Sequence, residues 1–236
     1  MALTIRGKND GFGAQYQAVM SGIAFCHAKN YLYKHTPLRC VDHNGNPEQL
    51  DTFMGVKSDS AADDCDTLIS EPYINEVHWH KYPSNYYTKE VSEKIRASYY
   101  STPKPPKCDY DVAIHIRRGD VHPETNDRYM PNDFYRKLLA RLKRKHPNST
   151  FCIYSEGSRK DFRDLESSGL FFHLNDGIEE TFHQLVTAKI LVTAKSSFSY
   201  SAGILSTGTV YYTPFWHKPL DHWKIIPGLS RWPFHW

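Results

Sequence analysis

The stretch DVAIHIRRGD at residues 111–120 decides the fold predicted for this chain. Its apolar part, residues 112–116, is too short for a helix and is followed by turn-forming residues, which indicates a buried strand over 111–116. The strand runs directly into two arginines, a glycine and an aspartate. In open α/β sheets ligands bind beyond the carboxyl ends of the strands, so this charged cluster lies where a binding site is expected.

The sequence of this stretch leaves two possible roles for the arginine pair. Arg117 and Arg118 are suited to phosphate, because each planar guanidinium can donate two charge-assisted hydrogen bonds to phosphate oxygens. The alternative is that they form surface ion pairs with Asp120 and Asp111. The stretch alone favours neither the phosphate site nor the ion pairs.

The composition is that of a soluble globular protein. The chain has 236 residues, of which 40% are hydrophobic and 23% charged, enough for one large domain or two small ones. A net charge of +3 is too small for a dedicated nucleic-acid-binding protein. The longest apolar runs fall short of the ~20 residues that span a membrane, and residues 1–6 do not form a signal-peptide core. We therefore expect a cytoplasmic protein, or one domain of a longer polypeptide, with neither a nucleic-acid partner nor a membrane span.

Three patterns bear on metal binding, and we predict no metal site from them. The five cysteines are odd in number and scattered, which favours reduced thiols over disulfides or a zinc site. Asp63, Asp64 and Asp66 lack the spacing of an EF-hand loop and are interpreted as a solvated acidic loop. His78 and His80 fall on one side of a predicted extended segment, but no third zinc ligand lies nearby in the sequence. We also expect no cofactor.

The first part of the chain has the pattern of a strand, a glycine loop and a helix. In order, these are predicted at residues 3–5, 6–13 and 14–29. The loop holds Gly11 and Gly13, but Tyr16 takes the place of the third glycine of a dinucleotide-binding fingerprint, and no Walker A lysine follows. Residues 37–71 are polar, have weak periodicity and are predicted to be a long irregular stretch.

A proline-rich segment at residues 101–107 marks the predicted domain boundary. Its prolines interrupt backbone hydrogen bonding and stiffen the chain. We predict an N-terminal domain over residues 1–107 and a C-terminal domain over 108–236 that ends in a tail.

Strands and helices alternate beyond this linker. The predicted strands are 111–116, 150–155, 190–194 and 209–213. The predicted helices are 132–145 with Asn132 as N-cap, a short one near 158–166, 179–189 and 198–205. Such alternation implies a mostly parallel sheet covered by helices on both faces. Since the first domain opens in the same way, the predicted fold class is α/β, with two Rossmann-like domains facing a cleft.

A serine-rich turn, AKSSFSYSAG at residues 194–203, lies between a predicted strand and a helix. Ser196 or Ser197 would cap that helix, whose free amides and dipole can bind an anion. Taken alone, the turn is only an N-cap. Together with the arginine pair on another strand of the same sheet, it predicts two phosphate-binding elements that converge on one cleft. A serine hydrolase is the competing use of such a turn, but the G-x-S-x-G elbow is missing.

These motifs resemble those of the GT-B fucosyltransferase superfamily, which comprises α1,2-, α1,6- and protein O-fucosyltransferases and related plant rhamnosyltransferases. HIRRGD at 115–120 is similar to its His-x-Arg-Arg-Gly/Thr-Asp motif, and FCIYS at 151–155 to its central strand. SSFS at 196–199 resembles its phosphate-binding serine turn, and DGFGAQ at 10–15 its opening glycine loop. The resemblance covers the first thirty residues and most of 108–215, and leaves 37–107 unmatched.

The resemblance implies a GT-B-like enzyme that transfers a 6-deoxy-L-hexose from a nucleotide diphosphate, with inversion and without a metal, to a glycan hydroxyl. Its partners would be a nucleotide-sugar donor, bound by the C-terminal domain, and an oligosaccharide or glycoprotein acceptor on the N-terminal side. Arg117 would stabilise the departing diphosphate, and Asp10 would be the general base, with Asp120 as second choice. The implied nucleotide-sugar-binding residues are Gly11, Phe12, Gly13, His115, Arg117, Arg118, Glu180, Thr181, Ser196, Ser197 and Phe198.

One departure from the family pattern leaves the sugar open. Thr181 stands where α1,6-fucosyltransferases carry an aspartate that recognises the base, and Glu180 precedes it. Guanine offers two N–H donors that a carboxylate accepts together, whereas a threonine cannot. Either Glu180 substitutes and the donor is GDP-fucose, or the donor is UDP-rhamnose, and we hold these level. A non-catalytic nucleotide- or sugar-binding α/β module is the alternative to an enzyme, and an unrelated α/β protein is a third possibility.

Overall fold

The computed structural model describes residues 1–43, 45–60, 62–71, 73–124 and 127–226, and they form two compact units. Unit 1 contains Met1–Pro105 and Trp216–His222, and unit 2 contains Pro106–Phe215 and residues 223–226. The chain passes from one unit to the other inside the proline-rich segment 101–107. Part of the predicted C-terminal tail, residues 227–236, lies outside the described residues.

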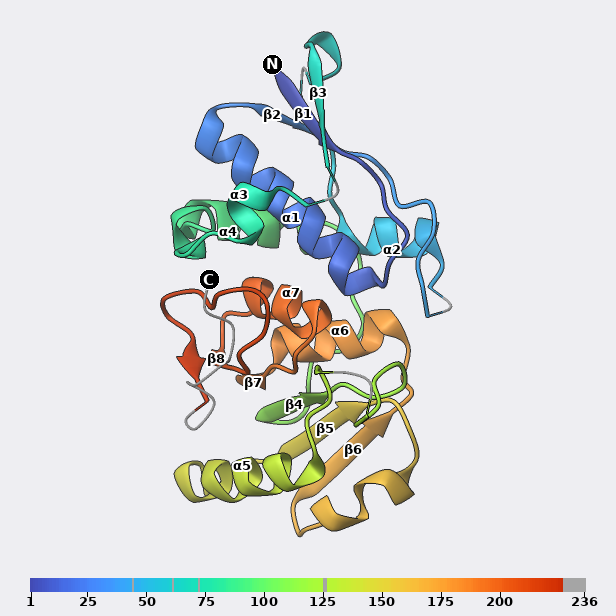
Figure 1. Ribbon diagram of the computed structural model, residues 1–236, viewed down its shortest axis with the longest axis vertical. Coiled ribbons are helices and arrows are strands. Elements are labelled where there is room, and N and C mark those ends of the chain that lie inside the picture. Colours follow the sequence, from blue (N-terminus) through green and yellow to red (C-terminus); the bar gives the residue numbers. More distant parts are fainter. Residues whose placement is uncertain (44, 61, 72, 125–126, 227–236) are drawn as a thin grey trace. The chain divides into compact units, whose positions relative to one another are not determined.

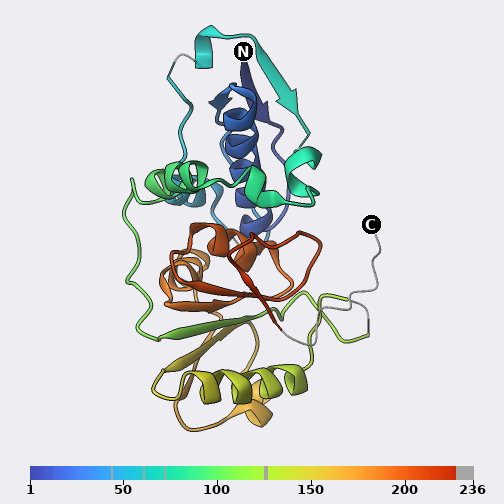
Figure 2. The ribbon, with the colours of Figure 1, turned by 90° about the vertical axis from the view of Figure 1, so that its left-hand side faces the viewer.

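Unit 1 is built on a parallel sheet in the order β2-β1-β3. Its strands are β1 (Ala2–Ile5), β2 (Leu32–Lys34) and β3 (Thr67–Ser70). Helix α1 (Phe12–Lys29) connects β1 to β2 and lies alongside these strands in both views (Figures 1 and 2). Tyr16, Met20 and Ile23 recur along α1 and are buried, which is the periodicity that predicted the helix.

The stretch 37–71 was predicted to be irregular, and this prediction is wrong. It contains α2 (Pro47–Met54) as well as β3. The start and end of α2 are fixed by local chemistry, because the Asn46 side chain accepts a hydrogen bond from the Gln49 amide and Gly55 ends the helix in the left-handed conformation. A helix this short offers too few apolar positions for its periodicity to be recognised.

Four more helices lie in the described part of unit 1. They are η1 (Ala62–Asp64), α3 (Asn75–His78), η2 (Pro83–Asn85) and α4 (Lys89–Tyr99). The segment around His78 and His80 was predicted to be extended, whereas His78 is the last residue of α3. An alternation of polar and aromatic residues over three positions does not distinguish one helical turn from a strand.

Unit 2 holds a parallel sheet of six strands in the order β6-β5-β4-β7-β8-β9. The strands are β4 (Val112–Ile116), β5 (Phe151–Ser155), β6 (Leu170–Leu174), β7 (Ile190–Val192), β8 (Thr209–Tyr212) and β9 (Lys224–Ile225). The helices are α5 (Asn132–Lys145), η3 (Arg159–Leu165), α6 (Ile178–Thr187) and α7 (Ser197–Leu205). Figure 1 shows α6 and α7 on one face of the sheet and α5 on the other. The predicted α/β class with parallel strands is confirmed.

Alternation along β4 directs its side chains to the two faces. Val112, Ile114 and Ile116 belong to the hydrophobic core that α5 and η3 cover. His115 faces the other way and its ring packs on Phe198 of α7, with centroids 5.6 Å apart. Because successive side chains of a strand point to opposite faces, a core strand delivers one histidine toward α7.

Three details of unit 2 differ from the sequence prediction, and the first is the two-residue strand β9, which was not predicted. Strand β6 was missed, since it is an edge strand that pairs only with β5 and has a partly exposed apolar run. Asn132 was predicted to be the N-cap of its helix, but Pro131 takes that position and Asn132 is the first helical residue. The Asn132 side chain instead accepts a hydrogen bond from Arg118 at 2.7 Å, a partner that the local sequence does not reveal.

The strand order reverses direction between β4 and β7. From β4 the chain builds outward through β5 to β6, and from β7 it builds the other way through β8 to β9. At such a reversal the two connections leave the sheet on opposite faces, and a crevice opens beyond the carboxyl ends of the two strands. In unit 2 this edge lies where β4 gives way to Arg117 and β7 to the serine turn.

We predict that Gly55→Ala destabilises unit 1. Gly55 has a φ of +66°, and a Cβ there would lie 2.2 Å from the backbone oxygen of Ser98 in α4. The left-handed conformation alone costs an alanine about 1–2 kcal/mol, and the shift of the α4 backbone adds to that. Gly7→Ala is the control, since no atom lies within 4 Å of its Cβ position. Urea unfolding should show a loss for Gly55→Ala only, and equal stabilities of the two variants would contradict this account.

Candidate functional site

The strand-order reversal in unit 2 brings together two of the predicted phosphate-binding residues. Strands β4 and β7 pair in parallel, with Ile114 opposite Val192, so both chains leave the sheet at the same edge. Arg117 follows β4 and Ser196 follows β7. Arg117 Nη1 donates a hydrogen bond to Ser196 Oγ at 3.1 Å, although the two residues are 79 positions apart.

The guanidinium of Arg117 is held by two groups. Its Nε and Nη2 donate to the two oxygens of Asp120, at 3.0 and 2.5 Å. The ion pair considered from the sequence is therefore present for Arg117. Together with the bond to Ser196 it uses three of the five N–H donors of the guanidinium. An ion pair with Asp120 and a contact to phosphate are thus compatible.

The serine turn leads into the N-terminus of α7. Ser196 is the N-cap, and its Oγ accepts a hydrogen bond from the Phe198 amide at 3.2 Å. Ser197 is the first helical residue, and the first turn holds no acidic side chain. Ser199 Oγ accepts a hydrogen bond from the Ala194 amide at 3.0 Å, which fixes the turn. Because amides of the first turn lack a partner within the helix, this end of α7 can bind an anion.

His115 forms an uncharged part of the same edge. Its side chain is 9% exposed, and burial, with a smaller effect of the Arg117 charge, lowers its pKa to about 3. The imidazole is therefore neutral at physiological pH. Among the described residues its Nδ1 has no hydrogen-bond partner. Its ring packs on Phe198, which in turn packs on Phe182 of α6 at 5.2 Å.

Arg118, which was predicted to bind the nucleotide sugar, is held by contacts within unit 2. Its Nη1 donates to the Arg117 carbonyl at 2.8 Å, and its Nη2 donates to the Met130 carbonyl at 3.0 Å and to Asn132 Oδ1 at 2.7 Å. The guanidinium also lies 4.3 Å from the ring centroid of Tyr129. These contacts tie the end of β4 to the start of α5, so we interpret Arg118 as a structural residue. Arg118 does not form the considered ion pair with Asp111, which lies at the other end of β4 and binds Lys189 at 2.6 Å.

The two candidates for recognition of the base lie in the first turn of α6. Glu180 is exposed and Thr181 is half-buried. The next residue, Phe182, packs on Phe198, so this turn is close to the start of α7. Among the described residues, neither side chain has a hydrogen bond to Arg117 or Ser196.

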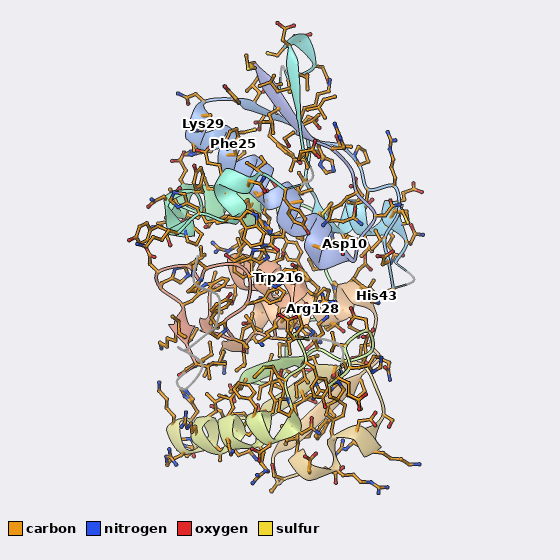
Figure 3. All side chains as sticks on the ribbon, in the orientation of Figure 1. Asp10, Phe25, Lys29, His43, Arg128 and Trp216 are labelled. Carbon is orange, nitrogen blue, oxygen red and sulfur yellow. The ribbon has the colours of Figure 1, made fainter. Side chains whose placement is uncertain are left out.

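The glycine loop belongs to unit 1, where α1 begins (Figure 3). Both oxygens of Asp10 accept hydrogen bonds, Oδ1 from the Gly11 amide at 2.8 Å and Oδ2 from Lys8 Nζ at 2.6 Å. Lys8 also donates to the Tyr73 hydroxyl, and its side chain is 14% exposed. The Asp10 side chain remains 45% exposed. Its carboxylate is thus fixed in orientation and open to solvent.

The other predicted loop residues differ in what they can contact. Gly11 is the N-cap of α1, and Gly13 is buried within the first turn. The Phe12 side chain is 2% exposed and packs on Tyr16 and Phe53, so it belongs to the core of unit 1. Only the backbone of Phe12 can face a ligand. The predicted site residues therefore form two groups, one in each unit.

The sequence prediction missed two basic residues of unit 2. Lys195 immediately precedes Ser196, is 4% exposed, and donates from Nζ to the Asp127 carbonyl at 2.8 Å. Arg128 Nη2 lies 4.0 Å from Asp120 Oδ2 (Figure 3 labels Arg128). The position of Lys195 beside the serine turn could have indicated that it belongs to the site. A lysine is usually exposed, however, so its burial was not expected.

Possible metal ligands are not gathered in the described part of the chain, where no three His, Cys, Asp or Glu side chains form a group suited to a metal. The His78 ring instead packs edge-to-face on His217 of unit 1 with centroids 3.9 Å apart, and burial lowers the pKa of His78 to about 2. All five cysteines are free thiols. None of the helices among the described residues has the length and apolar character that crossing a membrane requires.

Comparisons with known proteins give structural likenesses only: no family model matches the chain, and no curated protein matches it. The E. coli heptosyltransferase WaaC with ADP-2-deoxy-2-fluoro heptose is similar at a TM-score of 0.46 and 14% identity, over 98% of this chain and 95% of that chain. POFUT1 in complex with GDP is similar at a TM-score of 0.36 and 10% identity, over 89% of this chain and 98% of that chain. Because these TM-scores are low, function is inferred from the site itself.

The structural role of Arg118 predicts that Arg118→Ala and Arg117→Ala differ in stability. Arg118→Ala should lower the free energy of unfolding by about 2–4 kcal/mol, because it leaves the Met130 carbonyl and Asn132 without their donor. Arg117→Ala should cost about 1 kcal/mol or less, since its ion pair with Asp120 is partly exposed. Urea unfolding measures both, and equal losses would remove the distinction between the two arginines.

Proposed function

We propose that the protein is a glycosyltransferase that takes a 6-deoxy-L-hexose from a nucleotide-diphosphate donor and transfers it, with inversion and without a metal, to a hydroxyl of an oligosaccharide or glycoprotein. The observation that carries the proposal is the hydrogen bond between Arg117 and Ser196 at the strand-order reversal of unit 2. A guanidinium and a helix N-terminus there meet in the crevice where nucleotides bind in open α/β sheets. The motif resemblance of both residues to the GT-B fucosyltransferase superfamily supplies the reaction.

The proposed chemistry requires a group that stabilises the departing diphosphate. A nucleotide sugar carries two phosphate charges, and the leaving nucleoside diphosphate gains a third. Arg117, the Ser196 hydroxyl and the amides of the first turn of α7 are held in place before the donor binds, and the Ser197 hydroxyl lies in the same turn. Pre-fixed donors aimed at developing charge are an effective way to lower the barrier of such a reaction.

Asp10 is the proposed general base for the acceptor hydroxyl. Its carboxylate is 45% exposed and is held by Lys8 and the Gly11 amide, so it can accept a proton from a docked hydroxyl without reorienting. Asp120 was the second choice from the sequence. Both of its oxygens accept hydrogen bonds from Arg117, which makes it a partner of the arginine rather than a free base.

The donor is proposed to be GDP-fucose or UDP-rhamnose, which stay level. The exposed carboxylate of Glu180 lies in the first turn of α6 and can accept the N–H donors of guanine. The Thr181 hydroxyl, one residue on, is half-buried and cannot form that paired contact. A uracil base requires no such carboxylate, so the choice depends on which diphosphate binds.

A thermal-shift panel of GDP, UDP and TDP tests the donor site. The diphosphate of the true donor should raise the melting temperature, since a ligand at 100 times its Kd stabilises a protein by about 2.7 kcal/mol. Arg117→Ala should weaken that binding by about ten- to a hundredfold, the loss expected for hydrogen bonds to a charged group. Arg136→Ala, an exposed arginine of α5, is the matched control and should bind as the wild type does. Full affinity and activity in Arg117→Ala would refute the proposal.

Asp10→Asn tests the general base. This variant should lower kcat by about a hundredfold or more while the donor Kd stays unchanged, because the amide cannot accept the proton. The exposed neighbour Asp42→Asn is the control and should retain activity. Assays run in EDTA should give the same wild-type rate if the transfer needs no metal. An unchanged rate in Asp10→Asn would exclude Asp10 as the base. If the wild type binds a nucleotide but shows neither transfer nor donor hydrolysis, the protein is a non-catalytic nucleotide-binding protein.

A further inference from the structure

Lys195 is a buried cation beside the anion site of unit 2. It lies in the turn between β7 and α7, directly before the N-cap Ser196, and is 4% exposed. Lysine is almost never buried to this extent unless its charge is compensated, because removing an ammonium from water is costly. In this chain the buried ammonium belongs to the residue directly before the anion-binding end of α7.

The amine of Lys195 reaches the segment that follows β4. Its Nζ donates to the Asp127 carbonyl at 2.8 Å, and Asp127 lies in the same connection as Arg117, Asp120 and Arg128. Lys195 and Ser196 thus bind this connection at two points, through Asp127 and through Arg117. A cation and a hydrogen-bond acceptor on consecutive residues therefore contact the connection that carries Arg117.

Apart from Lys195, the charged side chains near the site leave a net charge of only one positive unit, because two arginines share one carboxylate. Arg117 is paired with Asp120 at 2.5 Å, and Arg128 lies 4.0 Å from the same carboxylate. Asp120 therefore offsets part of the positive charge that would face a donor with two phosphates. The N-terminus of α7 adds only about half a unit charge.

We propose that Lys195 supplies a second positive charge to the diphosphate site, from a buried position at the β7–α7 turn. This inference rests on the proposed function, since it identifies a further binding residue for the same donor. Lys195 would act on the diphosphate through the electric field of its buried ammonium, which is strong because little water screens it.

The proposal has a consequence for pH. Burial lowers the pKa of Lys195 to about 8, and the nearby Asp127 raises it to a smaller extent. Below pH 8 the amine is charged and favours the diphosphate, and above pH 8 it is neutral and that contribution disappears. The other groups at the site are Arg117, Arg128, Asp120 and the neutral His115. Arginine and aspartate side chains in general keep the same charge from about pH 7 to pH 9.

Calorimetric titration of the full chain with GDP and with UDP, across about pH 7 to pH 9, tests this inference. The wild type should bind the diphosphate more tightly than Lys195→Met at the lower pH, and that ratio of affinities should shrink about tenfold over the range as the amine loses its proton. Taking the ratio cancels the ionisation of the nucleotide itself. Lys195→Arg should keep most of the affinity at both ends, and the exposed Lys137→Met of α5 should follow the wild-type profile.

Proton uptake gives a second readout that needs only the wild type. At about pH 8.5 binding should take up about half to three quarters of a proton, measured by titration in buffers of different ionisation enthalpy. Tight binding without proton uptake, or a constant ratio of affinities, would overturn the role of Lys195 and leave the proposed function standing. If neither nucleotide binds at any pH, the proposed function fails and this inference fails with it.

Discussion

The parallel pairing of β4 with β7 is the constraint on which the proposed donor site depends. It joins two strands whose connections run in opposite directions across the sheet, so their carboxyl ends share one edge without a helix crossing between them. Arg117 and Ser196 meet there although they are 79 positions apart. Alternation along β4 then sends Ile114 into one core and His115 toward α7. A single strand thus anchors the sheet and supplies the site.

Electrostatic balance explains why the site combines so many charged residues. An arginine and a buried lysine at one sheet edge would repel each other in the free protein, and Asp120 offsets that repulsion by binding the Arg117 guanidinium. His115 avoids adding a further charge, since burial keeps its imidazole neutral. The positive charges of Arg117 and Lys195 thus lie near the N-terminus of α7, an end that itself favours an anion.

The two units use the same strand-to-helix turn in opposite ways. In unit 1 the turn before α1 carries Asp10, whose own carboxylate accepts the Gly11 amide at the helix start. In unit 2 the turn before α7 carries a neutral serine cap and no acidic residue in the first turn. In unit 1 that carboxylate lies beside the N-cap Gly11, whereas in unit 2 the end of α7 carries neutral side chains and can bind an anionic ligand. This difference supports placing a base in unit 1 and a diphosphate in unit 2.

The sequence by itself determined the alternating strands and helices of unit 2, the parallel α/β class, and the motifs around Arg117 and Ser196, because periodicity and turn residues are local properties. It did not reveal α2 or the edge strand β6, whose patterns are too short or too exposed to be recognised alone. Only the tertiary structure decided what each charged side chain does. Arg118 donates a hydrogen bond to the Met130 carbonyl just before α5, Asp120 binds Arg117, and Lys195 is buried. These roles follow from strand order and burial, which bring together residues distant in the chain and set the dielectric around them.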